Sequence, residues 1–117
     1  MLKIRKEQMQ VLSGYMLHMF KDRMVRHLRA AFKIKLEKIT EEELRTLVDT
    51  GIDKAKYYNI ITEDDVQTYL EYMVSYSHDF DMNSETSWAG DILSQKDIDG
   101  SLKMIRLKKT ASIKREA

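Results

Sequence analysis

The sequence predicts an all-α protein, a single-domain helical bundle of four to five helices with a long N-terminal helix. Three observations support this fold class. The 117 residues include no proline and four glycines, which is too little turn-forming material for a many-turned β fold. Apolar residues recur at three- and four-residue steps along most of the chain. Threonine followed by three acidic residues, a typical helix start, occurs at Thr40 and again at Thr62.

The first helix is predicted from about Arg5 to Phe32. Its apolar residues fall on one side of a helix, and Lys21, Arg26 and Arg29 fall on the other. Gly14 lies inside this pattern at a cost of roughly 1 kcal/mol relative to alanine, which suggests a close packing contact or a kink. Residues 33–39 are interpreted as an extended connector that buries Ile34 or Leu36.

Two capped helices are expected next. Thr40 and Glu43 have the spacing of a capping box, and that helix should end near Tyr58, with Asn59 in the left-handed conformation. The helix that follows Thr62 should end between residues 77 and 80. The link at 59–61 is short, so these helices should form an antiparallel hairpin.

The last third of the chain begins with a loop at 81–87. Thr86 or Ser87 is then expected to cap a short helix that carries Trp88, and Asp99 to cap a last helix. The apolar residues of the last helix are Leu102, Ile105 and Leu107. The predicted core is Leu12, Met16, Phe20, Leu28, Leu44, Leu47, Val48, Ile52, Val66, Leu70, Met73, Trp88, Ile92 and Leu93.

Length and composition fit one domain, with 43% apolar and 33% charged residues. We place a helical domain at residues 1–107 and a basic C-terminal tail at 108–117, which either continues the last helix or frays. No apolar run reaches the roughly 20 residues of a membrane span, and no secretory signal opens the chain, so we expect no membrane association and a cytoplasmic location. The absence of cysteine excludes disulfides, thiolate zinc sites and a cysteine nucleophile.

The charge is distributed unevenly. Residues 1–38 hold ten Lys/Arg and three Asp/Glu, residues 39–100 hold four and fifteen, and residues 101–117 hold six and one. The basic and acidic regions either neutralise each other within the fold or present two patches of opposite sign, one of which docks a charged partner.

Motifs for catalysis and for cofactors are missing from the sequence, so no catalytic residue, cofactor or metal is expected. His18 and His27 are nine residues apart and face opposite sides of a helix, and no glycine-rich phosphate loop occurs. Residues 79–90 resemble a calcium loop at their first four ligand positions, but Ser84 replaces the turn glycine and Gly90 the bidentate acid.

Two groups of residues are candidates for partner binding. One is the basic face of the first helix, and the other is a set of aromatic residues off the apolar stripe of the middle helices. Tyrosine and methionine side chains are more often core residues than contact residues, so exposure decides between these roles. The candidates are Arg23, Arg26, Arg29, Tyr72, Tyr76 and Trp88.

Three stretches resemble a group of small, mostly uncharacterised helical proteins of bacteria, associated with gene clusters for type VI secretion and its spike-linked toxins. The stretches are 20–32, then 61–66 with Tyr69 and Met73, then 79–81 with 88–93. The resemblance covers most of residues 3–107 and contains no catalytic signature. It implies a cytosolic accessory role as an adaptor, a chaperone or a neutralising partner of a secreted toxin.

We therefore expect a non-enzymatic, adaptor-like or chaperone-like protein whose partner is a protein, such as a secreted toxin or a spike component. Two alternatives stay open. One is an immunity protein that neutralises a toxin, and the other is a helical protein that binds nucleic acid through its basic N-terminal helix, against which the acidic middle of the chain argues. The sequence also leaves homo-oligomerisation open.

Overall fold

The computed structural model describes residues 8–116. For residues 10, 115 and 116 it describes the main chain but not the side chain. It contains five α-helices and two short 3-10 turns within residues 8–116, in the order η1 (Met9–Val11), α1 (Gly14–Ala31), α2 (Glu41–Tyr57), α3 (Glu63–Ser75), η2 (Ser84–Thr86), α4 (Ser87–Leu93) and α5 (Gly100–Glu116). The predicted all-α single-domain fold is confirmed.

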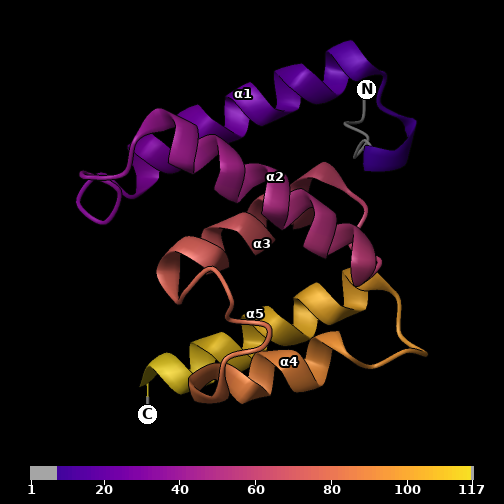
Figure 1. Cartoon of the computed structure of the whole chain (residues 1–117). Helices are drawn as coiled ribbons and strands as arrows, with labels where there is room; N and C mark the ends of the chain where they lie inside the picture. The colour runs from indigo at the N-terminus through magenta and orange to yellow at the C-terminus, as the bar shows by residue number, and fades with distance from the viewer. Residues whose placement is uncertain (1–7, 117) are drawn as a thin grey trace, which may run out of the picture.

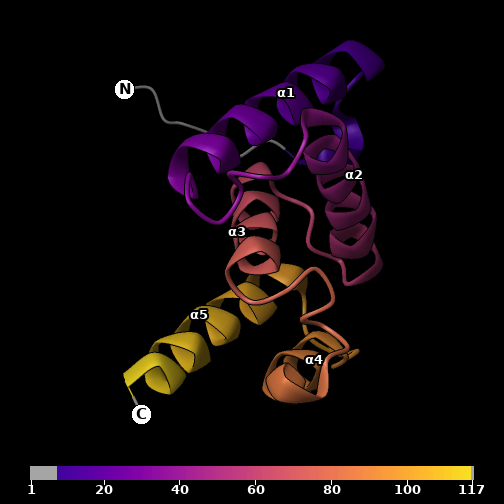
Figure 2. The same cartoon turned by 60° about the vertical axis from the view of Figure 1, so that its left-hand side comes forward.

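The helices form two pairs joined by a central helix (Figure 1). α1 packs on α2, α4 packs on α5, and α3 lies between the pairs in contact with both α2 and α5. The turned view in Figure 2 shows the same separation, with α4 and α5 on the opposite side of α3 from α1. None of the helices within residues 8–116 is both long enough and apolar enough to cross a membrane.

The first helix begins later than predicted. Ser13 is the N-cap of α1, because its side chain accepts a hydrogen bond from the Met16 backbone N–H at 3.2 Å. Before it, η1 ends at Val11 and Leu12 has extended backbone, and the part of the predicted helix at residues 5–7 lies outside the described residues. Gly14 is the first residue of α1, and a Cβ there would meet no atom within 4 Å, so the predicted contact or kink is wrong.

The connector after α1 is also different from the prediction. Residues 32–38 form a series of turns rather than an extended segment. Arg29 holds these turns by donating hydrogen bonds to the carbonyls of Leu36 at 2.6 Å and Ile39 at 2.9 Å. Leu36 is buried, as one of the two predicted options, whereas Ile34 is 87% exposed.

The predicted starts of the middle helices are confirmed. Thr40 and Glu43 form the complete capping box, and the Thr62 side chain accepts from the Asp65 N–H at 3.3 Å. α2 ends at Tyr57, and Asn59 has a φ of 65°, the left-handed conformation expected after a helix. α3 ends at residue 75, a little before the predicted range.

The last two helices confirm one predicted cap and not the other. Asp99 accepts from the Leu102 N–H at 2.9 Å, as predicted. Thr86 makes no cap to α4, because its hydroxyl donates instead to the Phe80 carbonyl at 2.7 Å. α5 continues without a break past Leu107 to residue 116, so the predicted tail at 108–117 is, up to that residue, the end of this helix.

The core lies around α3. Most of the predicted core is buried, but Leu12, Leu47, Ile52, Trp88 and Ile92 are only partly buried and Met16 is exposed. The predicted core contained no residue of α5, although four of its side chains are buried, Lys103, Met104, Leu107 and Ala111. Of the three apolar residues named for this helix, Leu107 is buried, whereas Leu102 and Ile105 are exposed.

Candidate functional site

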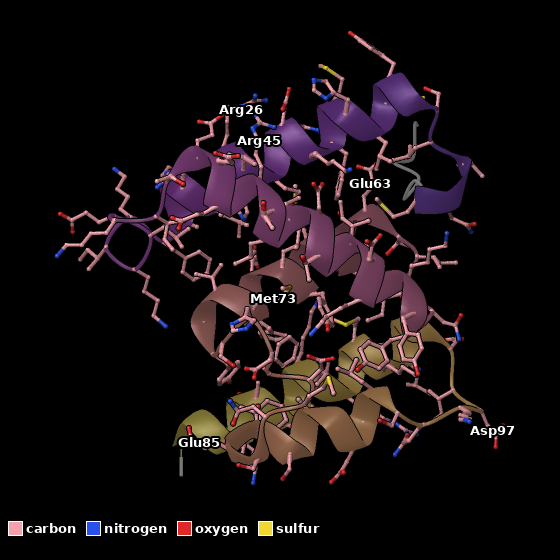
Figure 3. The ribbon with its side chains drawn as sticks, in the orientation of Figure 1. Arg26, Arg45, Glu63, Met73, Glu85 and Asp97 are labelled. Atoms are coloured by element: carbon pink, nitrogen blue, oxygen red, sulfur yellow. The ribbon has the colours of Figure 1, made fainter. Side chains whose placement is uncertain are left out.

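The six candidate residues occupy two separate parts of the molecule. The arginines lie on α1, whereas Tyr72 is on α3, Tyr76 directly follows α3 and Trp88 is on α4; Figure 1 shows α1 and α4 on opposite sides of α3. Figure 3 marks these regions by Arg26 in the α1–α2 pair and by Glu85 beside the start of α4. The two groups therefore do not form one surface.

The arginines are used mainly within the chain. Arg23 pairs with Glu63 at 3.1 Å and lies over the Phe20 ring, with 5.4 Å between the guanidinium carbon and the ring centre. Arg29 holds the turns after α1 through the two carbonyl bonds described above. Arg26 is exposed. Only part of the predicted basic face is thus available to a partner.

The aromatic candidates, in contrast, form one continuous cluster. The ring centres of Tyr72 and Tyr76 are 5.9 Å apart, and those of Tyr76 and Trp88 are 5.6 Å apart. Both tyrosines also pack on the fully buried ring of Phe80, at 6.0 and 6.4 Å. Tyr76 is 36% exposed, whereas Tyr72 and Trp88 are half-buried. The cluster is therefore anchored from below and open at its surface.

Two adjoining hollows follow this cluster, of about 310 and 290 Å³. Tyr76 and the exposed Lys114 of α5 line both of them, Tyr72 lines the first, and Trp88 and Glu85 line the second. We call the surface formed by Tyr72, Tyr76, Trp88 and Lys114 the aromatic groove. Sequence reasoning found its three rings but not Lys114, which it placed in the basic tail.

Side-chain hydrogen bonds span the loop between α3 and α4, next to the aromatic groove. The Asp79 carboxylate accepts hydrogen bonds from the Ser77 hydroxyl at 2.7 Å and from the Asn83 amide at 3.3 Å, and these bonds lower the pKa of Asp79. The Thr86 hydroxyl closes the same loop on the Phe80 carbonyl. Side-chain bonds that span such a loop restrict its motion, which favours a preformed orientation of Trp88 against Tyr76.

A second site, missed by the sequence reasoning, lies where the end of α2 meets the start of α5. The buried Asp81 carboxylate accepts from Lys54 Nζ at 2.9 Å and from the Tyr58 hydroxyl at 2.6 Å. Lys103 Nζ donates to the backbone carbonyl of Tyr58 at 3.0 Å. These groups line a pocket of about 900 Å³, which we call the lysine pocket. Burial and the Asp81 carboxylate raise the pKa of the Tyr58 hydroxyl.

The candidate metal ligands are held apart by other bonds. Asp79 accepts from Ser77 and Asn83, whereas Asp81 accepts from Lys54 and Tyr58, so the two carboxylates of the calcium-like stretch face different partners. His27 contacts Glu71 at 2.6 Å, and His18 contacts Asp22 at 3.4 Å. Within the described part of the chain, no three His, Asp or Glu side chains gather as a metal site would require.

Searches against protein-family models, curated proteins and solved structures find no match for this chain.

Proposed function

We propose that this protein is a non-enzymatic binding module that holds a segment of a partner protein in the aromatic groove. The observation that carries the proposal is the contiguous, partly exposed cluster of Tyr72, Tyr76 and Trp88 on two elements of the fold. Tyrosine and tryptophan give large contact areas with few rotatable bonds, and they dominate the binding energy of many protein interfaces.

The groove also favours a particular partner chemistry. The rings offer apolar faces to a hydrophobic side chain, and Lys114 places a positive charge beside them. Lys35 adds a second ammonium near the end of α3, where it donates to the Ser75 carbonyl at 2.7 Å. A segment with an apolar residue next to an acidic one would match the rings and Lys114, and its acidic residue would lie away from Glu85 in the second hollow. The charges would then set its orientation and on-rate.

The resemblance of this chain to accessory proteins of type VI secretion clusters favours a secreted toxin or a spike component as the partner. A chaperone and an immunity protein would differ in co-expression. A chaperone is required for the solubility of its partner, whereas an immunity protein suppresses the toxicity of a partner that is soluble without it. Co-expression of the chain with the products of neighbouring genes separates these roles.

Affinity capture with the full chain as bait tests the proposal. We expect the chain to recover a protein from an extract of its source cells in stoichiometric amount, and Tyr76→Ser to lose that protein. Lys114→Glu, which leaves the ring packing intact, should weaken capture as well. Tyr15→Ser is the matched control, because Tyr15 is an exposed tyrosine on α1, away from the groove.

Two outcomes of the capture experiment would contradict the proposal. Thermal melting of each variant is measured first, to check that the fold is intact. Retention of the same protein by Tyr76→Ser and Lys114→Glu, or its loss in Tyr15→Ser alone, would place the binding surface elsewhere and contradict the proposal.

A further inference from the structure

Lys103 in the lysine pocket is an unusual residue for its position. Its side chain is on the first turns of α5 and is 3% exposed, although lysine is almost never fully buried without an ionic partner. Its ammonium donates to the Tyr58 carbonyl at 3.0 Å and lies 5.8 Å from the centre of the Tyr58 ring. No carboxylate of the described residues forms an ion pair with it, and burial alone lowers the pKa of Lys103.

The buried acid of the pocket, Asp81, already has two partners. Asp81 is 2% exposed at its side chain, and its two oxygens accept from Lys54 Nζ and the Tyr58 hydroxyl. The residues that line the pocket include three lysines, Lys54, Lys96 and Lys103, and two aspartates, Asp53 and Asp81. The lining therefore has one positive charge in excess.

Part of the role of Lys103 is structural. The Tyr58 carbonyl belongs to the C-cap residue of α2, and a lysine that donates to such a carbonyl stabilises the helix end. This bond uses one of the three N–H donors of an ammonium group. The other donors of a group so deeply buried require acceptors, and an acceptor with negative charge would offset the loss of hydration.

We propose that the lysine pocket binds a small organic anion, whose carboxylate or phosphate group is held by Lys103 and whose apolar or aromatic body lies against Tyr57 and Met82. These two side chains line the pocket and are 80% and 78% exposed. The volume of about 900 Å³ is within the range of small-molecule sites. The proposal is independent of the proposed function, because it concerns different residues.

The test is an amide NMR titration of the full chain at constant ionic strength with three probes that share a phenyl ring, sodium benzoate, phenyl phosphate and benzamide, of which benzoate and benzamide are matched in shape. Benzoate or phenyl phosphate should shift the resonances of Tyr57, Met82 and Lys103 in a saturable way, and whichever binds more tightly identifies the anionic group. Neutral benzamide should bind about tenfold more weakly or not at all, because it lacks the charge-assisted bond.

Two lysine variants test which ammonium group of the pocket holds the anion. Lys103→Met keeps the length and packing of the stem and should weaken anion binding by about tenfold or more. Lys96→Met is the matched control, because Lys96 is an exposed lysine of the same pocket and should change the affinity by less than about threefold.

Several results would overturn the proposal. Equal shifts with benzamide and benzoate would show that no anion is recognised. Unchanged affinity in Lys103→Met would exclude Lys103. An absence of saturable shifts in the unmodified chain would mean that Lys103 only caps the end of α2. Because the three probes are compared on the unmodified chain, the proposal is tested even if Lys103→Met fails to fold.

Discussion

Thr40 shows how a single side chain fixes a helix boundary in this protein. Its hydroxyl accepts from the Glu43 N–H at 3.0 Å, and the Glu43 carboxylate accepts from the Thr40 N–H at 3.0 Å. Both donors belong to the first turn of α2, where no carbonyl of the helix reaches them. The Thr62 and Asp99 side chains cap α3 and α5 in a simpler way.

Substitution Thr40→Ala should lower the free energy of unfolding by about 1 kcal/mol, because it leaves the Glu43 N–H without its side-chain acceptor. Thr46→Ala is the control, since Thr46 is an exposed residue within α2 and alanine is the better helix former. Urea denaturation of both variants provides the comparison. An equal loss in the two would show that the capping box does not stabilise the helix.

Tyr69 places a polar hydroxyl group in the apolar core. Its ring packs against Phe80 at 5.1 Å in the centre of the core, but its hydroxyl is buried and has no hydrogen-bond partner among the described residues. Burial raises the pKa of this hydroxyl well above its usual range, so it stays neutral. The hydroxyl therefore costs desolvation without a compensating bond.

We expect Tyr69→Phe to leave stability unchanged or to raise the free energy of unfolding by up to about 1 kcal/mol. The ring and its contacts are kept, and only the unpaired hydroxyl is removed. Chemical denaturation measures the change. A loss of more than about 1 kcal/mol would mean that the hydroxyl makes a bond that this account lacks.

Asp22 links α1 to α2 and makes stability depend on pH. Its carboxylate accepts from Arg45 Nη1 at 2.8 Å, and this bond, with a smaller contribution from His18, lowers the pKa of Asp22 below its ordinary value of 3.8. A carboxyl group whose pKa is lower in the folded state stabilises the fold above the unfolded pKa. That contribution is lost as the pH falls through the folded pKa.

The variant Asp22→Asn should therefore melt at a lower temperature than the unmodified protein at neutral pH. The difference should shrink as the pH falls below about 3.8. Melting curves recorded from neutral pH to below that value measure it. A difference that stays constant over the whole range would show that the charge of Asp22 is not responsible.

At the scale of elements, the joint between α2 and α5 connects the two halves of the fold. Gly100, the first residue of α5, packs directly on the main chain of Asn59 and Ile60. The Ser101 hydroxyl donates to Asp65 at 3.3 Å, and Lys103 donates to the Tyr58 carbonyl. The start of α5 is thus tied to the end of α2 and to the start of α3.

A Cβ at residue 100 would overlap the Asn59 carbonyl oxygen and come within 2.7 Å of the Ile60 Cα. Main-chain atoms cannot move aside as the end of a side chain can, so Gly100→Ala should destabilise the protein by about 1–3 kcal/mol. Gly14→Ala is the matched control, because a Cβ there meets no atom within 4 Å. It should be neutral or stabilising by up to about 1 kcal/mol.

Thermal and urea unfolding of both variants test this difference between the two glycines. Equal stability of Gly100→Ala and Gly14→Ala would contradict the close approach of α5 to the end of α2.

The helices also show which features of the fold can be predicted from the sequence and which cannot. The starts of α2, α3 and α5 were predictable because a cap is a local interaction between residues three apart. The buried face of α5 was not, because its apolar residues do not form one stripe and Lys103 occupies an inward position. Contacts with α3, with α4 and with the end of α2 decide which side of α5 faces inward, and these contacts lie outside the helix itself.

At the scale of the whole molecule, the two candidate sites lie on different parts of the α4–α5 side of the bundle. The aromatic groove involves the end of α5, and the lysine pocket its start. Figure 3 shows Glu85 and Asp97 at opposite ends of this pair of helices. A protein segment and a small anion could therefore bind at the same time without competing for contacts.

Sequence reasoning anticipated the groove better than the pocket. Tyr72 and Tyr76 are four residues apart, so their proximity on one helix face follows from helical geometry alone. Trp88 joins them only because the loop after α3 folds back over Phe80. The pocket depends on Lys54, Asp81 and Lys103, which are far apart in the sequence and have no common motif.

Trp88 provides the most direct test of the central claim that the aromatic groove binds a protein partner. It is the one tryptophan of the chain, so the chain's own tryptophan emission, after subtraction of that of the partner alone, reports on the groove. When the captured partner is added to the full chain, the emission should shift to shorter wavelength and become less sensitive to acrylamide, with saturation at a fixed stoichiometry. A complex that forms while the emission and quenching of Trp88 stay unchanged would contradict the account.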